Sequence, residues 1–186
     1  MGASDRCYEL LDRLTTLLRT EERGLAGAKD LQPAQLAVLA YLSRCNRYSN
    51  TPGAVTEYLG VTKGTASQTL RRLIDRELIA EDADADDARK TRLRLTPRGR
   101  NIVRGSLPPA VFAQALSAVS DTDGLQASLA ELLRGLQRAN DMRTFGVCRT
   151  CRHLLHSRRS FRCGLTGEAL REEETTRICR EHEVVP

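Results

Sequence analysis

Residues 56–96, TEYLGVTKGTASQTLRRLIDRELIAEDADADDARKTRLRLT, decide the fold of this chain. They predict a short helix, a tight turn at Gly60, a second helix and then a β-hairpin. Gly60 suits the turn because glycine tolerates positive φ, and Thr62 stands where a hydroxyl can cap the following helix. The apolar residues of that helix recur on one face, at Ala66, Leu70, Leu73 and Ile74. This spacing indicates a helix with one buried face.

The opposite face of the second helix carries donor-rich side chains, the kind that contact base edges and phosphates. The DNA-contacting residues predicted here are Thr62, Lys63, Thr65, Ser67, Gln68, Arg71 and Arg72. A solvated amphipathic helix without any partner would show the same periodicity. Because the helix pattern fits both interpretations, it is the segment after this helix that favours DNA binding.

That segment is a hairpin whose return strand is basic. Residues 78–79 begin the first strand, residues 81–87 form an acidic tip that we expect to be flexible, and residues 89–96 alternate polar and apolar side chains. Such alternation is typical of a half-buried strand. A helix-turn-helix followed by a basic hairpin is a winged helix, and Arg89 and Lys90 are predicted to contact a minor groove or its phosphates.

These motifs resemble the MarR family of bacterial regulators over about residues 5–140. The resemblance rests on Leu78-Ile79, Asp87-Ala88-Arg89 and the run LRLTPRG at 93–99, with LQPAQ at 31–35 and GVTKGT at 60–65 upstream. It implies a mainly α fold, a winged helix-turn-helix with a small β-hairpin wing. It also implies a homodimer, formed by the first and last helices, that binds double-stranded operator DNA, with paired helices reading a palindrome. Glu81 departs from the family, whose members usually carry Arg there, so the phosphate contact at that position is not carried over.

Composition agrees with a polyanion partner. The formal net charge of the 186 residues is +5 and the pI is about 9.1, and residues 88–104 hold seven Arg or Lys and no acid. Such a balance suits nucleic acid without proving it. The sequence has no run of eighteen apolar residues and no signal-peptide pattern, so we expect a cytoplasmic protein that does not enter the membrane.

Leucine-rich helices at the two ends of the first 141 residues predict a dimer. Residues 5–19 and 125–136 each carry an apolar face, more than one small domain covers easily. Intramolecular packing is the alternative. We expect residues 1–141 to form the DNA-binding and dimerisation domain. Residues 46–53, NRYSNTPG, give that domain a loop slightly longer than the fold needs.

Residues 142–186 differ in composition and form a separate cysteine-rich tail. The predicted metal ligands are Cys148, Cys151, Cys163 and Cys179, spaced Cys-x2-Cys-x11-Cys-x15-Cys. In a reducing compartment, such cysteines favour metal or redox chemistry over disulfides. Two thiolates two residues apart can hold one ion from a tight turn. A metal would also supply the folding energy that so short and polar a segment lacks.

The ligand spacing favours an iron–sulfur cluster over zinc. Structural zinc sites usually pair their ligands as two Cys-x2-Cys units, whereas here the second pair is fifteen residues apart. Zinc is the alternative, and His153, His156 and His182 are possible substitute ligands. Cys45 is more typical of a small buried residue than of a sensor thiol.

Catalytic motifs are missing from the sequence, which has no Gly-x-Ser-x-Gly, no phosphate-binding glycine loop and no His-Glu-x-x-His. We therefore predict a regulator and not an enzyme, with an iron–sulfur cluster that senses redox state or iron. The alternatives are the same regulator with a structural zinc and a small-molecule effector, a redox or electron-transfer protein, and a zinc-stabilised scaffold. Because the tail follows the last leucine-rich helix, we expect metal loss to act on DNA binding through the dimer interface.

Overall fold

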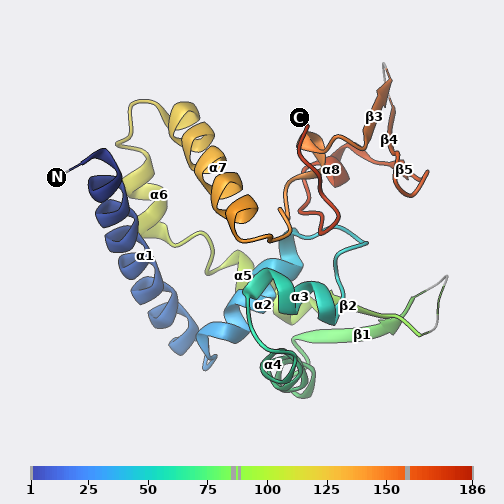
Figure 1. The fold of residues 1–186 in the computed structure, drawn as a ribbon. Helices are drawn as coiled ribbons and strands as arrows, with labels where there is room; N and C mark the ends of the chain where they lie inside the picture. The colour runs from blue at the N-terminus through green and yellow to red at the C-terminus, as the bar shows by residue number, and fades with distance from the viewer. Residues whose placement is uncertain (1, 85–86, 88, 158–159, 186) are drawn as a thin grey trace.

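The structure is a computed structural model that describes residues 2–84, 87, 89–157 and 160–185. Helices make up most of the first part of the chain (Figure 1). They are α1 (Ala3–Gly27), α2 (Pro33–Arg44), α3 (Pro52–Leu59), α4 (Lys63–Asp75), α5 (Pro97–Arg104), α6 (Ala110–Leu116) and α7 (Thr122–Ala139). Strands β1 (Ile79–Ala83) and β2 (Thr91–Leu95) lie between α4 and α5. The predicted winged helix-turn-helix with its β-hairpin is confirmed.

The turn between α3 and α4 has the predicted chemistry. Gly60 adopts a φ of 62°, in the left-handed region that favours glycine. The Thr62 hydroxyl accepts a hydrogen bond from the Thr65 N–H at 3.2 Å and so caps α4. Thr51 caps α3 in the same way, through the Ala54 N–H. These caps fix where both helices of the motif begin.

The core of the domain surrounds α2. Its largest fully buried side chains include Leu36, Leu39 and Tyr41 of α2, together with Leu73 of α4 and Leu93 of β2. In the wing, Ile79 pairs with Leu95 and Glu81 with Leu93. The start of α5 packs closely on this hairpin: a Cβ at Gly99 would lie 2.1 Å from the Leu78 carbonyl oxygen. Only glycine permits that approach.

Helices α1 and α7 carry the exposed leucines of the domain. Helix α1 continues to Gly27, well past the predicted end near Arg19, because its last turn packs on the core through the fully buried Ala26. Leu14 on α1 is 54% exposed, and Leu133 and Leu136 on α7 are 54% and 55% exposed. Figure 1 shows α7 standing away from the core helices. One protomer thus leaves both apolar faces largely uncovered.

The tail has secondary structure of its own. It contains the 3-10 turn η1 (Cys148–Thr150), strands β3 (Leu154–Ser157), β4 (Ser160–Cys163) and β5 (Ala169–Leu170), and helix α8 (Glu172–Thr175). The strands form one antiparallel sheet in the order β3-β4-β5. Within the described residues, no helix is long and apolar enough to cross a membrane. Residues 85, 86 and 88, in the predicted acidic tip and wing signature, lie outside the described residues.

Candidate nucleic-acid interface and metal centre

Helix α4 presents its predicted polar face to solvent. Ala66, Leu70 and Leu73 are buried against the domain. All seven predicted contact residues of the motif are exposed: Thr62, Lys63, Thr65, Ser67, Gln68, Arg71 and Arg72. Among the described residues, none of the three cations in this set has an ion-pair partner. The face is therefore available to a polyanion, and its role in binding DNA stays a prediction.

A groove of about 640 Å³ runs between α3, α4 and the first wing strand. Lys63, Ser67 and Arg71 line it from α4, and Glu57 lines it from α3. Glu81 of β1 faces the same groove. The acid that departs from the family pattern thus lies beside two basic residues of the reading helix, where it makes the surface less positive.

The wing neutralises its own basic side chains. Residues 79–96 contain five acids and four bases, and the described ones pair across the hairpin. Arg94 Nε lies 2.6 Å from Asp82 Oδ2, and Arg92 pairs with Asp84. Asp87 pairs with Arg89 and Lys90, the two wing residues predicted to contact DNA. Its carboxylate lies 3.1 Å from Arg89 Nε and 3.7 Å from Lys90 Nζ. The hydrogen bond from Arg89 lowers the pKa of Asp87. The sequence prediction of a basic wing did not foresee this pairing.

The four predicted ligands line one small cavity in the tail. The cavity measures about 30 Å³, and Cys148, Cys151, Cys163 and Cys179 all face it. Cys163 is partly exposed and the other three are buried. The Cys151 N–H donates to the Cys148 carbonyl at 3.0 Å, which closes the predicted tight turn. Strand β4 then brings in Cys163, and the segment after α8 brings in Cys179, so residues far apart in sequence converge.

The environment of two of these thiols, Cys148 and Cys179, favours their protonated form. Burial, together with the nearby Cys179, Cys151 and Cys163, raises the pKa of Cys148 to about 12. Burial also raises the pKa of Cys179, against hydrogen bonds from Asn46 and from the Glu181 backbone. Within the described part of the chain, no three His, Cys, Asp or Glu side chains are grouped closely enough to form a metal site as they stand. The donor set still fits a thiophilic metal, which binds deprotonated sulfur and displaces these protons.

Of the three histidines, only His153 lines the cysteine cavity. Its Nε2 lies 3.2 Å from a Glu183 carboxylate oxygen. His156 instead stacks on Phe161, with ring centroids 4.9 Å apart. His182 is buried, and its ring nitrogens lie 2.7 Å and 3.0 Å from the hydroxyls of Thr144 and Thr150. Those contacts occupy both ring nitrogens of His182.

The tail docks on α2, α3 and the loop between them. The Asn46 N–H donates to the Ile178 carbonyl at 2.8 Å, and the Ile178 N–H donates to the Arg44 carbonyl at 2.9 Å. Arg180 donates to both carboxylate oxygens of Glu57 on α3, at 2.7 Å and 2.5 Å. Phe145 packs against Tyr58, with ring centroids 5.3 Å apart.

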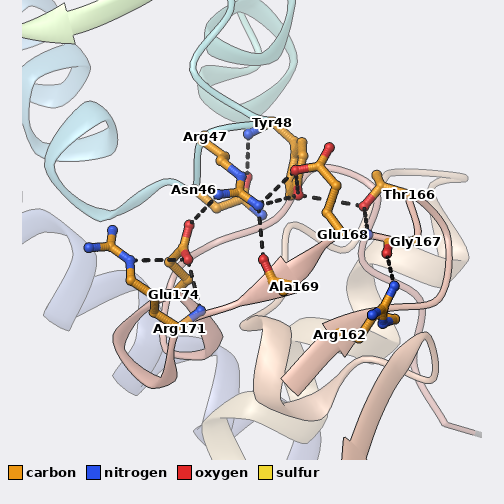
Figure 2. Close-up of polar contacts among 10 residues, drawn as sticks. All are labelled: Asn46, Arg47, Tyr48, Arg162, Thr166, Gly167, Glu168, Ala169, Arg171 and Glu174. Atoms are coloured by element: carbon orange, nitrogen blue, oxygen red, sulfur yellow. Dashed lines mark hydrogen bonds and ion pairs between the residues drawn. The ribbon is translucent and has the colours of Figure 1, made fainter. Parts of the chain in front are cut away.

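A second polar cluster anchors the sheet of the tail to the same loop (Figure 2). Arg47 contacts Glu168 at 2.8 Å and Glu174 at 3.3 Å, and it donates to the Ala169 carbonyl. The Tyr48 hydroxyl donates to Glu168 at 2.9 Å. Sequence reasoning missed this docking surface. The one sequence feature that could have indicated it was the extra length of the loop at 46–53, because that loop forms the docking surface.

The winged-helix part of the chain matches a known protein family. Residues 29–90 match the model of the MarR family. This match covers 62 of the 186 residues and includes the reading motif and most of the wing, so this part of the chain is similar to that family. Members of this family are transcriptional regulators and not enzymes, so the prediction of a non-enzymatic protein is confirmed. The match covers no part of residues 142–186, whose metal site stays a prediction.

Solved structures share the fold at low sequence identity. A point mutant of S. aureus MepR is 23% identical, with a TM-score of 0.54 over 74% of this chain and 100% of that one. BldR from Sulfolobus solfataricus is 18% identical, with a TM-score of 0.55 over 72% and 99%. The M. tuberculosis regulator MosR, solved in complex with DNA, is 24% identical, with a TM-score of 0.51 over 75% and 98%. No curated protein matches the chain.

Proposed function

We propose that this protein is a DNA-binding transcriptional regulator that works as a homodimer and carries a metal centre in its tail. The observation that carries the first part is the exposed polar face of α4, held by a buried apolar face inside a domain similar to the MarR family. MosR, which shares the fold, has been solved with DNA. These two findings support a helix that enters the major groove and reads base edges.

The exposed leucines support a second copy of the chain as the partner of α1 and α7. An uncovered stripe that includes Leu129, Leu132 and Leu136 is costly to leave in water. Pairing two protomers through these helices would set the distance between two α4 helices. A two-fold dimer then reads a palindromic operator with half-sites about 34 Å apart.

The tail is proposed to hold its metal through Cys148, Cys151, Cys163 and Cys179, because all four thiols line one cavity. An iron–sulfur cluster is the first candidate, because Cys163 and Cys179 come from separate segments and do not form a second Cys-x2-Cys unit. Such a cluster would supply a redox or iron signal. Zinc is the second candidate, and the small volume of the cavity, about 30 Å³, favours it. A zinc ion would supply a constant cross-link.

One preparation tests both parts of the proposal. Protein purified without oxygen is analysed for iron, sulfide and zinc, and its visible spectrum is recorded. Iron with a visible absorption band supports the sensor, one zinc per chain in colourless protein supports the structural site, and absence of both rejects the metal centre. A salt-dependent mobility shift on DNA taken from upstream of the protein's own gene tests the regulator. Binding that ignores salt, or no binding, rejects the DNA-reading assignment.

A further inference from the structure

The loop between α2 and α3 places two buried polar side chains beside a predicted metal ligand. Asn46 is 7% exposed and Ser49 is fully buried. The Asn46 N–H donates to the Ile178 carbonyl at 2.8 Å, one residue before the ligand. Burial raises the pKa of Cys179, and hydrogen bonds from the Asn46 and Ser49 side chains act against that rise. These contacts come from the winged-helix domain, whereas all four predicted ligands come from the tail.

The remaining hydrogen bonds of Asn46 and Ser49 join the two side chains to each other and to the chain next to Cys179. Asn46 Oδ1 accepts from the Ser49 hydroxyl at 2.7 Å and from the Tyr48 N–H at 3.1 Å. Ser49 Oγ also accepts from the Arg180 N–H at 2.8 Å, directly after the ligand. The network thus holds the backbone on both sides of Cys179, at Ile178 and at Arg180.

We propose that Asn46 and Ser49 are positioning residues of the metal centre, so that metal loading and the order of α3 form one linked equilibrium. This inference rests on the metal centre proposed above. Donors in the outer shell of a metal site stabilise the deprotonated ligand and fix its orientation. Removing such a partner typically costs about 10–100-fold in metal affinity.

Contacts next to Asn46 and Ser49 connect the metal centre to α3, the first helix of the reading motif. Two residues after Ser49, the hydroxyl of Thr51 caps α3. At the other end of α3, Glu57 accepts two hydrogen bonds from Arg180, the residue next to Cys179. The segment 179–180 therefore touches both the entry and the last turn of the first helix of the motif. Loss of the metal would release both contacts together.

The first test measures Zn²⁺ affinity of the full chain by competition with a chromophoric chelator. Asn46→Asp keeps an acceptor oxygen for Ser49 and Tyr48 but replaces the donor with a negative charge, and we expect Zn²⁺ to bind about 10–100-fold more weakly. Ser49→Ala, which adds no charge, should shift affinity in the same direction. Asn101→Asp makes the same charge change at an exposed position of α5 and should bind as wild type does.

The second test measures amide hydrogen exchange of residues 52–59 with and without Zn²⁺. Zn²⁺ should slow exchange of α3 about 5–150-fold in the wild type, and by less in Asn46→Asp, with residues 122–139 as the internal reference. Wild-type Zn²⁺ affinity in both loop variants, or α3 exchange unchanged by Zn²⁺, overturns the inference while the metal centre stands. A wild-type chain that neither contains metal as purified nor binds Zn²⁺ rejects the metal centre, and this inference with it.

Discussion

Between α2 and the wing, the interior consists of aliphatic side chains such as Leu39, Leu73 and Leu93, whereas the tail buries mainly thiols, Thr175 and His182. The domain can therefore gain its stability from burial of apolar surface. The tail has little such surface to bury. Phe145 and Ile178 pack against the core of the domain, and its other contacts there are hydrogen bonds and partly exposed ion pairs. Exposed pairs of this kind contribute little to stability. The difference implies that the domain folds by its core, while the tail depends on its four cysteines.

The largest expected effect is the loss of ordered structure in the tail when one cysteine is removed. Cys148→Ser removes one of the four cavity-lining thiols, and we expect residues 143–185 to lose metal and become sensitive to protease, because little else orders them. Helices α2 to α5 should keep their protection in the same sample. Limited proteolysis with mass spectrometry measures both. If the tail of the variant resists cleavage as the wild type does, its stability does not depend on the cysteines.

The complementary change tests the domain. Leu73→Ala truncates a fully buried side chain of α4, and we expect a loss of about 2–5 kcal/mol of unfolding free energy in chemical denaturation. Leu129→Ala on α7 is the matched control, because that leucine is 45% exposed in one protomer. It should act on dimerisation, which light scattering reports. Equal losses in monomer stability from both variants would contradict the placement of the core.

The smallest effects separate the reading helix from the wing. Arg71→Ala should lower the slope of log affinity against log salt by about one if its guanidinium holds a phosphate. Arg89→Ala should lower it by less, because Arg89 is already paired with Asp87. Arg6→Ala, in an ion pair on α1, serves as the control. A larger change for Arg89 than for Arg71 would show that the wing gives up its internal pairs on binding DNA.

The reading motif was predictable because its signals are local. Gly60 marks the turn, Thr62 marks the cap, and the spacing of Ala66, Leu70 and Leu73 marks the buried face, so the exposed face followed from sequence alone. The convergence of the cysteines was also predictable as chemistry, and the identity of the metal stays a prediction.

Long-range polar pairing was not predictable, because charge partners carry no periodicity. Nothing in the sequence pairs Arg180 with Glu57, or Asn46 with Ile178, across more than one hundred residues. The expected route from tail to DNA ran through the end of the last leucine-rich helix. The structure shows a further contact of the tail, with α2 and α3, and only the length of the loop at 46–53 hinted at that surface.

The central claim is that the metal-bound tail and the DNA-reading motif act on each other, and DNA affinity tests it most directly. Affinity for the upstream DNA is measured at one fixed salt concentration for protein as purified, for protein stripped of metal by a chelator, and for Cys148→Ala. We predict that the stripped protein and the variant bind about 5–150-fold more weakly than the metal-loaded protein. Equal affinity in all three, with metal loss verified and the dimer intact, would contradict the claim.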